Sequence, residues 1–390
     1  MKNNIIIFLN AFWNNGNGTT GGDQMLKQIF KRNKNQFNKI YCYTSLDGQK
    51  FLQSEIDNAK YITEWTFLYN KNLLINYILR TFKALNSCMV NDINIIYGGS
   101  DFFPDVVPAF LYKIIHPKTK WVQCIFHIYP KWNKRQGNKF KNFVGEYSQK
   151  ISFLLIKKAD QIININSQVT KELIRQGFDK NKINLNTPGI DFNHLSSLEI
   201  DKTTAKYNAT FLGRLHASKG IFDLVKTWQI VTESIPDAKL AIIGGSNEKI
   251  KSELISEIIK NNLQNNIDIL GHLPDDLPFK LIKNSDVFIF PSHEEGFAIA
   301  IAEALACETP IVAWNLPSYK ETYGDLTTQV EENNINEFAK ATIEILSKSK
   351  PSNIAKPTKI SKSKPKLDKE FINKYDWDTV SKINLEILNK

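Results

Sequence analysis

The sequence predicts an α/β protein made of two doubly wound domains, each built on a parallel sheet. Short runs rich in Ile, Val and Phe recur along the chain, and stretches long enough for helices separate most of them. Apolar strands that alternate with helices are typical of parallel sheets covered on both faces. The pattern occurs twice in 390 residues, a length that suits two domains with separate cores.

The apolar runs predict where the strands lie. In the first half we expect them at 3–12, 39–45, 93–99, 120–129 and 160–167. In the second half we expect them at 206–215, 238–245, 266–273, 286–292 and 309–314. The stretch 191–208 between the two sets is polar and has no clear periodicity, so we place the domain join there.

The predicted domains are residues 1–195 and residues 196–370. Residues 347–369 of the second domain contain eight Lys, three Pro and one acid, a composition typical of a mobile linker. An amphipathic helix is expected over 371–388, within a C-terminal segment of residues 371–390.

The composition predicts a soluble protein of a reducing compartment. Hydrophobic residues make up 42% and charged residues 23% of the chain, and no apolar run approaches the length of a membrane span. The N-terminal segment has only a short apolar core, so we interpret it as a first strand and not as a signal peptide. The four cysteines are far apart and form no CxxC pair, which favours buried thiols over disulfides or a metal site. We therefore expect a cytoplasmic protein.

The charge is distributed unevenly. Residues 1–199 contain 26 Lys and Arg against 14 Asp and Glu, whereas residues 200–390 contain 24 against 26. A basic first half beside a nearly neutral second half suits two domains that bind different partners.

Two carboxylates bracket an uncharged stretch in PSHEEGFAIAIAEALACETPIVAW, residues 291–314. Glu295 follows a predicted strand, and ligands of open parallel sheets bind at the carboxyl ends of strands. A helix that begins near Phe297 would carry Glu303 in its second turn. Eight residues span at most about 12 Å along a helix, so the two acids suit two separate contacts on one elongated ligand. The helix N-terminus between them attracts an anion, and a nucleotide diphosphate sugar combines these features.

Two cations follow another predicted strand in FLGRLHASKG, residues 211–220. Arg214 and Lys219 at the rim of a sheet would offset the charge that develops on a departing pyrophosphate. Taken alone, both residues are also compatible with an ordinary solvated loop.

These motifs together resemble the retaining glycosyltransferases of family 4, which have the GT-B fold. The similarity rests on GRL…SKG, on the E-x7-E spacing of Glu295 and Glu303, and on EALACETPIVA after it. It extends to NTPGID at 186–191 and to the closing YDWDTVSKI. The resemblance implies two Rossmann-like domains that face each other across a cleft, with the last helix crossing back to the N-terminal domain.

The resemblance also implies roles for individual residues of the second domain. Arg214 and Lys219 would grip the donor diphosphate. Glu303 would bind the ribose hydroxyls, and Glu295 would contact hydroxyls of the transferred sugar. Gly296 and Phe297 would present backbone N–H groups to the donor.

In the first domain the family's Gly-Gly pair corresponds to Gly21 and Gly22, where the backbone approaches the phosphates closely. The family's histidine at the rim of this domain corresponds best to His127. Two of the family's common glycines are replaced in this chain, by Ala298 and Glu308, and the family's usual Asn-Gly before the interdomain crossover is Pro188-Gly189 here.

The implied reaction is metal-independent transfer of a sugar with retention of its anomeric configuration. The resemblance implies no cofactor apart from the donor substrate, which we expect to be a UDP-sugar, with a GDP-sugar as the second choice. The acceptor would be a glycan, a lipid-linked molecule or a small molecule, held by the basic first domain.

Two other functions stay open at this stage. GNGTTG at 16–21 matches G-x-G-x-x-G, so Gly16, Gly18 and Gly21 would serve a dinucleotide-dependent oxidoreductase. The residues NAFWNN, 10–15, lie between the apolar run and the motif, whereas in a dinucleotide fold the first Gly follows the strand at once, and a lone match of this kind is weak. A non-catalytic, glycosyltransferase-like partner subunit is the other alternative, although such a subunit has no need of the cations and carboxylates.

The segment 113–158 carries eleven Lys and Arg, one acid and interleaved aromatic residues. A solvated basic helix and loop would explain it. So would peripheral contact with an anionic membrane at its inner face. Nucleic acid ranks last, because no nucleic-acid motif accompanies the aromatics, and we expect no nucleic-acid partner.

The remaining polar residues near strand ends are expected to have structural roles. We expect His216, His272 and His293 to be solvated on rim loops, and Asp101 to cap the N-terminus of a helix.

Overall fold

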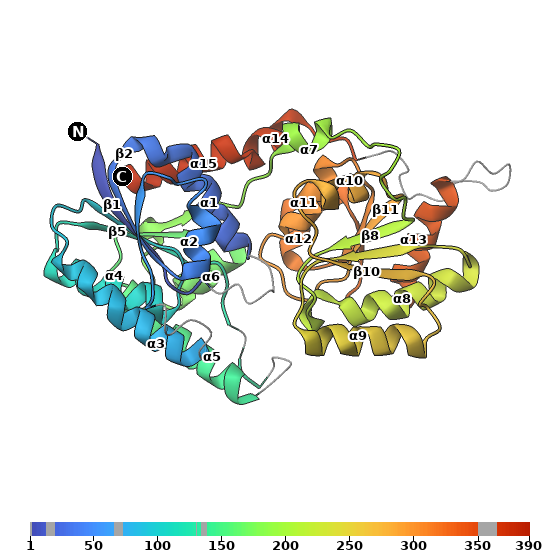
Figure 1. Ribbon diagram of the computed structural model, residues 1–390, viewed down its shortest axis with the longest axis horizontal. Helices are drawn as coiled ribbons and strands as arrows, with labels where there is room; N and C mark the ends of the chain where they lie inside the picture. The colour runs from blue at the N-terminus through green and yellow to red at the C-terminus, as the bar shows by residue number, and fades with distance from the viewer. Residues whose placement is uncertain (1, 13–19, 66–72, 130, 134–138, 350–364) are drawn as a thin grey trace. The chain divides into compact units, whose positions relative to one another are not determined.

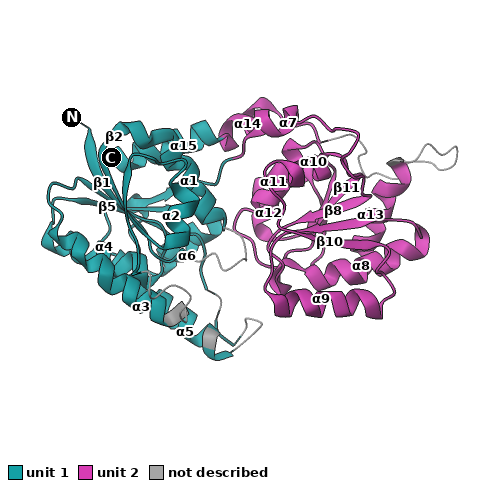
Figure 2. Cartoon of the chain, in the orientation of Figure 1, with its two compact units in different colours: residues 1–14, 19–189, 377–390 teal, residues 15–18, 190–376 magenta. Residues whose placement is uncertain are grey.

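The chain folds into two compact units, which Figure 2 shows in separate colours. Unit 1 comprises Met1–Asn14, Thr19–Gly189 and Trp377–Lys390, and unit 2 comprises Asn15–Gly18 and Ile190–Asp376. The computed structural model describes residues 2–12, 20–65, 73–129, 131–133, 139–349 and 365–390. Gly16, Gly18 and most of the predicted linker at 347–369 therefore lie outside the described residues.

Unit 1 is built on a parallel sheet of seven strands in the order β3-β2-β1-β4-β5-β6-β7 (Figure 1). The strands are β1 (Asn3–Leu9), β2 (Phe37–Thr44), β3 (Ala59–Ile62), β4 (Ile95–Gly98), β5 (Lys120–Cys124), β6 (Gln161–Asn164) and β7 (Ile183–Leu185). The helices are α1 (Gly21–Asn33), α2 (Leu46–Leu52), α3 (Leu73–Ala84), α4 (Phe103–Ile115), α5 (Lys139–Ile156), α6 (Ser167–Arg175) and α15 (Trp377–Asn389). A 3₁₀ turn, η3 (Leu85–Met89), follows α3 directly.

Both faces of this sheet are covered, which explains why its central strands are continuously apolar. Ile6 and Phe8 of β1 join a buried cluster with residues of α3, α4 and α5. Residues of α1 such as Ile29 and Phe30 are also buried, and the Phe30 ring meets Tyr97 of β4 edge-on at 5.1 Å between centroids. The α15 helix packs on α1, where the Asn33 side chain donates a hydrogen bond of 2.6 Å to Ser381 Oγ.

Unit 2 repeats the architecture with six parallel strands in the order β10-β9-β8-β11-β12-β13. The strands are β8 (Ala209–Leu212), β9 (Leu240–Ile243), β10 (Ile267–Gly271), β11 (Val287–Phe290), β12 (Ile311–Trp314) and β13 (Thr328–Val330). The helices are α7 (Phe192–Ser197), α8 (Ile221–Ser234), α9 (Glu248–Lys260), α10 (Leu277–Lys283), α11 (Ile299–Ala306), α12 (Pro317–Thr322), α13 (Ile335–Ser349) and α14 (Lys369–Tyr375).

The strand order fixes where each unit can bind a ligand. In both sheets the first three strands in chain order are added successively toward one edge of the sheet. The fourth strand lies on the other side of the first, and the later strands extend toward the opposite edge. The crevice at the carboxyl ends of these two central strands is the topological switch point, where doubly wound sheets bind ligands. The switch point lies between β1 and β4 in unit 1, and between β8 and β11 in unit 2.

The prediction of two parallel-sheet domains is confirmed, but the sequence missed three short strands. β3, β7 and β13 each lie at the edge of a sheet and have only one neighbouring strand. Their three or four residues are partly polar and mostly half-buried, so no continuous apolar run marks them. Several predicted strands were also too long, because their last apolar residues belong to the loops at the carboxyl edge.

The single helix expected over 371–388 is wrong in one respect. Asp376 is extended and forms a parallel bridge with Ile190, whose N–H donates a hydrogen bond of 2.7 Å to Tyr375 O. This bridge ends α14, and α15 begins at the next residue. The chain passes between the two units at Gly189 and Ile190, and again at Asp376 and Trp377.

Among the helices that the structure describes, none combines the length and the hydropathy that a membrane-spanning segment requires.

Gly220 provides a test of how closely the chain packs at the switch point of unit 2. Its φ is +70°, and an added Cβ would lie 1.9 Å from Pro291 O. Gly271 has a similar φ of +69°, yet nothing lies within 4 Å of its Cβ position. We expect Gly271→Ala to cost about 1–2 kcal/mol of stability for left-handed strain alone. Gly220→Ala should cost clearly more, as measured by denaturant unfolding, and equal losses would contradict the close approach.

Candidate functional site

Two loops meet at the switch point of unit 2. One follows β8 and runs through residues 213–220, and the other follows β11 and runs through residues 291–298. The His293 N–H donates a hydrogen bond of 2.9 Å to Ser218 O, and Ser292 Oγ lies 3.3 Å from the same oxygen. The predicted site residues of the second domain lie on these two loops and on α11.

Lys219 and Glu295 form the central ion pair of this site. Lys219 Nζ lies 2.6 Å from Glu295 Oε1, and it also donates a hydrogen bond of 3.2 Å to Glu294 O. Both side chains are largely shielded, with exposed fractions of 20% and 12%. The fully buried Ser292 donates a hydrogen bond of 2.9 Å to the same carboxylate oxygen. Glu295 therefore holds the ammonium group in place and keeps other acceptor lone pairs available.

Arg214 lies on the same loop as Lys219 but is exposed. Within the described ranges its guanidinium has no hydrogen bond or ion pair. An unpaired guanidinium beside a sheet's carboxyl edge has its donors free for an anion, and the planar fork suits a phosphate.

Glu303 lies in the second turn of α11, as expected. Its side chain is half-buried, and burial raises the pKa of its carboxyl to about 7. No hydrogen bond or ion pair to this carboxyl is found in the part of the chain that the structure describes. A shielded acid without a partner is costly in a folded protein, and a ligand hydroxyl would satisfy it.

The α11 helix begins at Ile299, two residues later than expected. Gly296 is half-buried and Phe297 is buried, and both precede the helix as irregular backbone. Tyr323 Oη donates a hydrogen bond of 2.5 Å to Phe297 O, lies 3.0 Å from Ala298 O, and so fixes this turn. No side chain caps the helix start. The Ile301 N–H donates to Ala298 O, so the N–H groups of Ile299 and Ala300 are the ones that an anion could use.

Two of the departures from the family sequence have a common structural basis. Ala298 has a φ of +59° and Glu308 a φ of +58°, at the two ends of α11. Glycine adopts this left-handed conformation without strain, whereas residues with a Cβ do so at a cost of about 1–2 kcal/mol. Both substitutions therefore strain the backbone and leave the charged side chains of the site unchanged.

The expectation that His293 is solvated is wrong. His293 Nε2 lies 2.8 Å from Asp223 Oδ2 of α8, and Nδ1 lies 2.7 Å from Glu332 Oε1 after β13. The hydrogen bond with Asp223 is the main cause that raises the pKa of His293. The imidazolium thus ties the Glu295 loop to two other elements. Its partners are distant in sequence, so no local spacing could have revealed this contact.

Gly21 and Gly22 of unit 1 are the first two residues of α1, after the cap residue Thr20. A Cβ on Gly22 would lie 2.6 Å from the ring of Phe126, so the helix start approaches the loop after β5 closely. Thr20 and Asp23 form a reciprocal capping box, which satisfies part of this helix terminus.

His127 lies in the loop after β5 and not at the end of a strand, because β5 ends at Cys124. Its side chain is exposed, and its ring meets Tyr129 edge-on at 5.1 Å between centroids. Gln149 of α5 donates hydrogen bonds to His127 O at 2.8 Å and to Asp101 Oδ2 at 2.6 Å. This glutamine fixes the backbone that carries His127.

Asp101 is not the helix cap that we expected, since the cap residue of α4 is Phe102. Asp101 is buried, and burial raises its pKa to about 6. Sequence reasoning also missed Asp105, which accepts a hydrogen bond of 2.6 Å from Asn10 N and holds the chain after β1. Burial raises the pKa of Asp105 to about 8.

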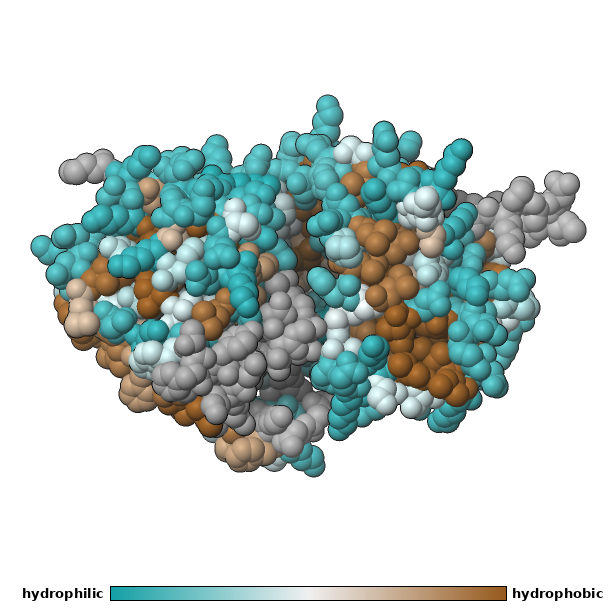
Figure 3. Space-filling view, in the orientation of Figure 1, coloured by the Kyte–Doolittle hydropathy of each residue, from teal (hydrophilic) through white to brown (hydrophobic). Residues whose placement is uncertain are grey.

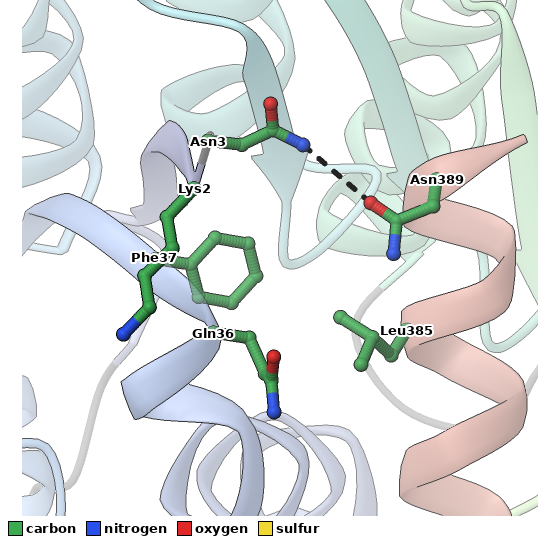
Figure 4. A pocket seen from close by; sticks show the side chains of 6 residues that line it. All are labelled: Lys2, Asn3, Gln36, Phe37, Leu385 and Asn389. Carbon is green, nitrogen blue, oxygen red and sulfur yellow. Dashed lines mark hydrogen bonds between the residues drawn. The ribbon is translucent and has the colours of Figure 1, made fainter.

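An open hollow of about 440 Å³ lies at the opposite edge of the unit 1 sheet (Figure 4). Asn3 and Phe37, the first residues of β1 and β2, line it together with Asn389 of α15. It is therefore remote from the carboxyl edge, and we assign it no ligand. The described residues contain no group of three or more His, Cys, Asp or Glu arranged to hold a metal ion.

The chemistry available in unit 2 suits an elongated anionic ligand. The two loops pair Lys219 with Glu295, the first of them also carries Arg214, and α11 adds Glu303 and a start without a side-chain cap. Cations and free N–H groups bind a diphosphate, and carboxylates accept hydrogen bonds from sugar hydroxyls. His127, Gly21 and Gly22 belong to unit 1.

The raised pKa of Glu303 predicts a pH-dependent effect of Glu303→Gln. An ordinary Glu titrates at about 4.3, so folding disfavours the ionised form and stability falls as the pH rises from about 4.3 to about 7. Removing the charge should raise the melting temperature at pH 8 by at least about 2 °C, and by less at pH 4.5. Glu253→Gln on the exposed side of α9 serves as the control, and an equal gain at both pH values would refute the assignment.

The His293 contacts predict the opposite dependence on pH. Folding raises the pKa of His293 above its unfolded value of about 6.5. The contacts of the protonated imidazole therefore stabilise the fold fully below about pH 6.5, and this stabilisation is lost as the pH rises through the pKa of the folded state. Burial alone would raise the pKa of Asp223, but its hydrogen bond with His293 lowers it overall, so this contribution is lost only in acid. His293→Gln should therefore lower the melting temperature more at pH 6 than at pH 9. His272→Gln should show no such difference.

Comparison with known proteins shows which proteins the chain resembles. Residues 198–363 match the family model of glycosyl transferases group 1. An uncharacterized glycosyltransferase of Methanocaldococcus jannaschii is 28% identical over 301 residues, which are 71% of this chain and 70% of that protein. The capsular polysaccharide biosynthesis glycosyltransferase CapM of Staphylococcus aureus is 29% identical over 47% of this chain, and the match spans half of CapM's length.

Solved structures share the fold over the whole chain. Anabaena Alr3699/HepE, crystallised in complex with UDP and glucose, has a TM-score of 0.74 and 18% sequence identity, and the match covers 99% of both chains. The sucrose-phosphate synthase of Thermosynechococcus elongatus has a TM-score of 0.71 and 14% identity, over 100% of this chain and 98% of that one. The family model covers the unit that carries the candidate donor site, and the glycosyltransferase prediction is thereby favoured over a dinucleotide-dependent oxidoreductase. Residues 198–363 therefore resemble group 1 glycosyltransferases, and the whole chain has the GT-B fold that these solved structures share.

Proposed function

We propose that this enzyme transfers a sugar from a UDP-sugar to an acceptor hydroxyl, with retention of the anomeric configuration and without a metal ion. The observation that carries the proposal is the meeting of the two switch-point loops of unit 2, which joins the Lys219–Glu295 pair and the loop of Arg214. Unit 2 would bind the donor, and the basic unit 1 would bind the acceptor.

In the proposed complex the donor diphosphate lies against Arg214, Lys219 and the uncapped start of α11. Backbone N–H groups at Gly296 and Phe297 approach the same part of the donor. Glu303 in its ionised form accepts hydrogen bonds from the ribose hydroxyls. Complexes of Anabaena Alr3699/HepE with UDP and with UDP-glucose support the choice of UDP.

The ion pair between Lys219 and Glu295 suits the transfer step. As the bond between the anomeric carbon and the diphosphate oxygen breaks, negative charge grows on the leaving group, and the two cations offset it. Glu295 would orient the sugar through its hydroxyls while keeping the ammonium in place. The acceptor oxygen then bonds to the anomeric carbon on the face that the diphosphate leaves, and its proton passes to the departing phosphate oxygen.

The proposal leaves the acceptor as a glycan, a lipid-linked molecule or a small molecule. His127 and the Gly21–Gly22 helix start of unit 1 are proposed to contact the reacting sugar and the phosphates. A non-catalytic partner subunit is the competing function, and only turnover distinguishes it from an enzyme.

The function is tested first by donor binding. A thermal-shift panel of UDP-, GDP- and ADP-sugars should raise the melting temperature most with a UDP-sugar, because a ligand that binds only the folded state stabilises it. Transfer from that donor should survive EDTA, and NMR should show the donor's anomeric configuration in the product. Donor binding without turnover across many acceptors would favour the partner subunit.

Substitution of the two cations tests the site itself. Arg214→Ala and Lys219→Ala should each lower kcat/KM by roughly 30- to 150-fold, equivalent to about 2–3 kcal/mol of transition-state stabilisation. Lys260→Ala on α9, an exposed lysine of the same unit, should leave kcat/KM unchanged. Melting temperatures of the three variants separate lost catalysis from lost folding, and full activity in both cation variants would remove them from the mechanism.

A further inference from the structure

Three neighbouring helices of unit 1 leave large apolar side chains exposed. α4 contacts both α3 and α5, and hydrophobic surface follows these helices along the lower left edge of the molecule in Figure 3. Met89 is 76% exposed, Phe140 75% and Leu154 65%. We call this surface the apolar face; it consists of Ile75, Ile78, Phe82, Met89, Ile114, Ile115, Phe140, Phe143, Val144, Tyr147, Ile151 and Leu154.

The spacing of these residues shows that they form continuous stripes. On α5 the exposed positions 140, 143, 147, 151 and 154 recur every three or four residues, which places them on one side of the helix. On α3 the positions 75, 78 and 82 do the same. The opposite side of α5 is already used, since Phe153 and Ile156 are buried in the core.

Among the described residues of unit 1, these side chains are exposed and lie outside its buried core. Single exposed apolar residues are common, but contiguous patches mark surfaces that bind a partner or a membrane. The apolar face therefore requires a partner of some kind, and the charges around it indicate which.

The surroundings of the apolar face are basic. Helices α3, α4 and α5 contain only two acidic residues, Asp105 and Glu146, and both are buried. The same segment of chain carries six exposed lysines, of which Lys150 is paired with Glu146: Lys118, Lys131, Lys139, Lys150, Lys157 and Lys158. A partner that complements this surface is anionic and offers an apolar layer beneath its charge.

The alternatives fit these observations less well. A second copy docked through the same face would bring lysine against lysine, and like charges across an interface are repelled. Nucleic acid binds through stacking aromatics, whereas most of the apolar face is aliphatic. An anionic bilayer supplies both the negative headgroups and the acyl chains.

We propose that the apolar face of α3, η3, α4 and α5 binds the surface of an anionic lipid bilayer. The side chains of Phe140, Leu154 and Met89 enter the boundary between headgroups and acyl chains, and the lysines contact lipid phosphates. The binding does not depend on the proposed sugar transfer, so it can fail or hold independently of that function.

Vesicle flotation tests the proposal with the full-length protein. The protein should float with vesicles of phosphatidylcholine containing 30% phosphatidylglycerol, and at least about tenfold less with pure phosphatidylcholine vesicles. Binding should weaken strongly at 0.5 M NaCl, because salt screens the lysine–phosphate attraction. Equal binding to both kinds of vesicle, or to neither, would overturn the proposal.

Two variants address the two parts of the surface. Phe140→Ser with Leu154→Ser should remove insertion, and Lys139→Glu with Lys158→Glu should remove electrostatic attraction, each lowering vesicle binding at least about tenfold. Ile255→Ser with Ile259→Ser is the matched control, because these exposed residues of α9 lie among mixed charges. The control should bind as the wild type does. All three proteins should keep the wild-type melting temperature, since the substituted side chains are exposed.

Further outcomes separate the competing explanations. Donor-dependent transfer to a water-soluble acceptor should be unchanged in the variants, since none of these residues belongs to the donor site. If sedimentation without lipid shows a dimer that the Phe140→Ser, Leu154→Ser variant dissociates, the apolar face is a self-association surface and the membrane proposal is wrong.

Discussion

The candidate donor site of unit 2 depends on the close approach of two loops at one switch point. Gly220 has no Cβ, so the chain after β8 can lie directly against Pro291 after β11. That approach lets the Ser218 carbonyl accept a hydrogen bond from the other loop and lets Lys219 reach Glu295. A larger residue at position 220 would separate the cations from the carboxylate. The charged groups are thus positioned by backbone packing, and their own attraction adds to an arrangement that already exists.

The charged side chains of unit 2 differ in whether an oppositely charged partner lies beside them. Lys219 and Glu295 neutralise each other in a shielded position, and His293 lies between two carboxylates. Arg214 is exposed and Glu303 is half-buried, and neither side chain has a partner within the described structure. Burial of the unpaired Glu303 carboxyl is unfavourable for folding alone, and a ligand that supplies the missing contact would offset this cost. The left-handed backbone at Ala298 and Glu308 costs further folding free energy at the two ends of α11.

Unit 1 has a different balance of charge and hydropathy. Its carboxyl edge holds buried acids, Asp101 and Asp105, which organise the loops after β1 and β5 through backbone and amide contacts. Its outer helices instead expose apolar residues and lysines. A basic unit with an apolar face and a nearly neutral unit with an anion site would let one enzyme bind a membrane and a water-soluble donor at once.

The sequence by itself determined the two parallel sheets and the E-x7-E site, because buried strands and a helix with two flanking acids are local patterns. It could not reveal the edge strands, whose three or four half-buried residues carry too weak a signal. Nor could it reveal the His293 contacts, the break at Asp376 or the true role of Asp101, since each depends on partners dozens or hundreds of residues away. Elements with a local hydrophobic period can be predicted from the sequence. Contacts between residues distant in the chain form only when the sheets and helices have packed, and these contacts give the site its geometry.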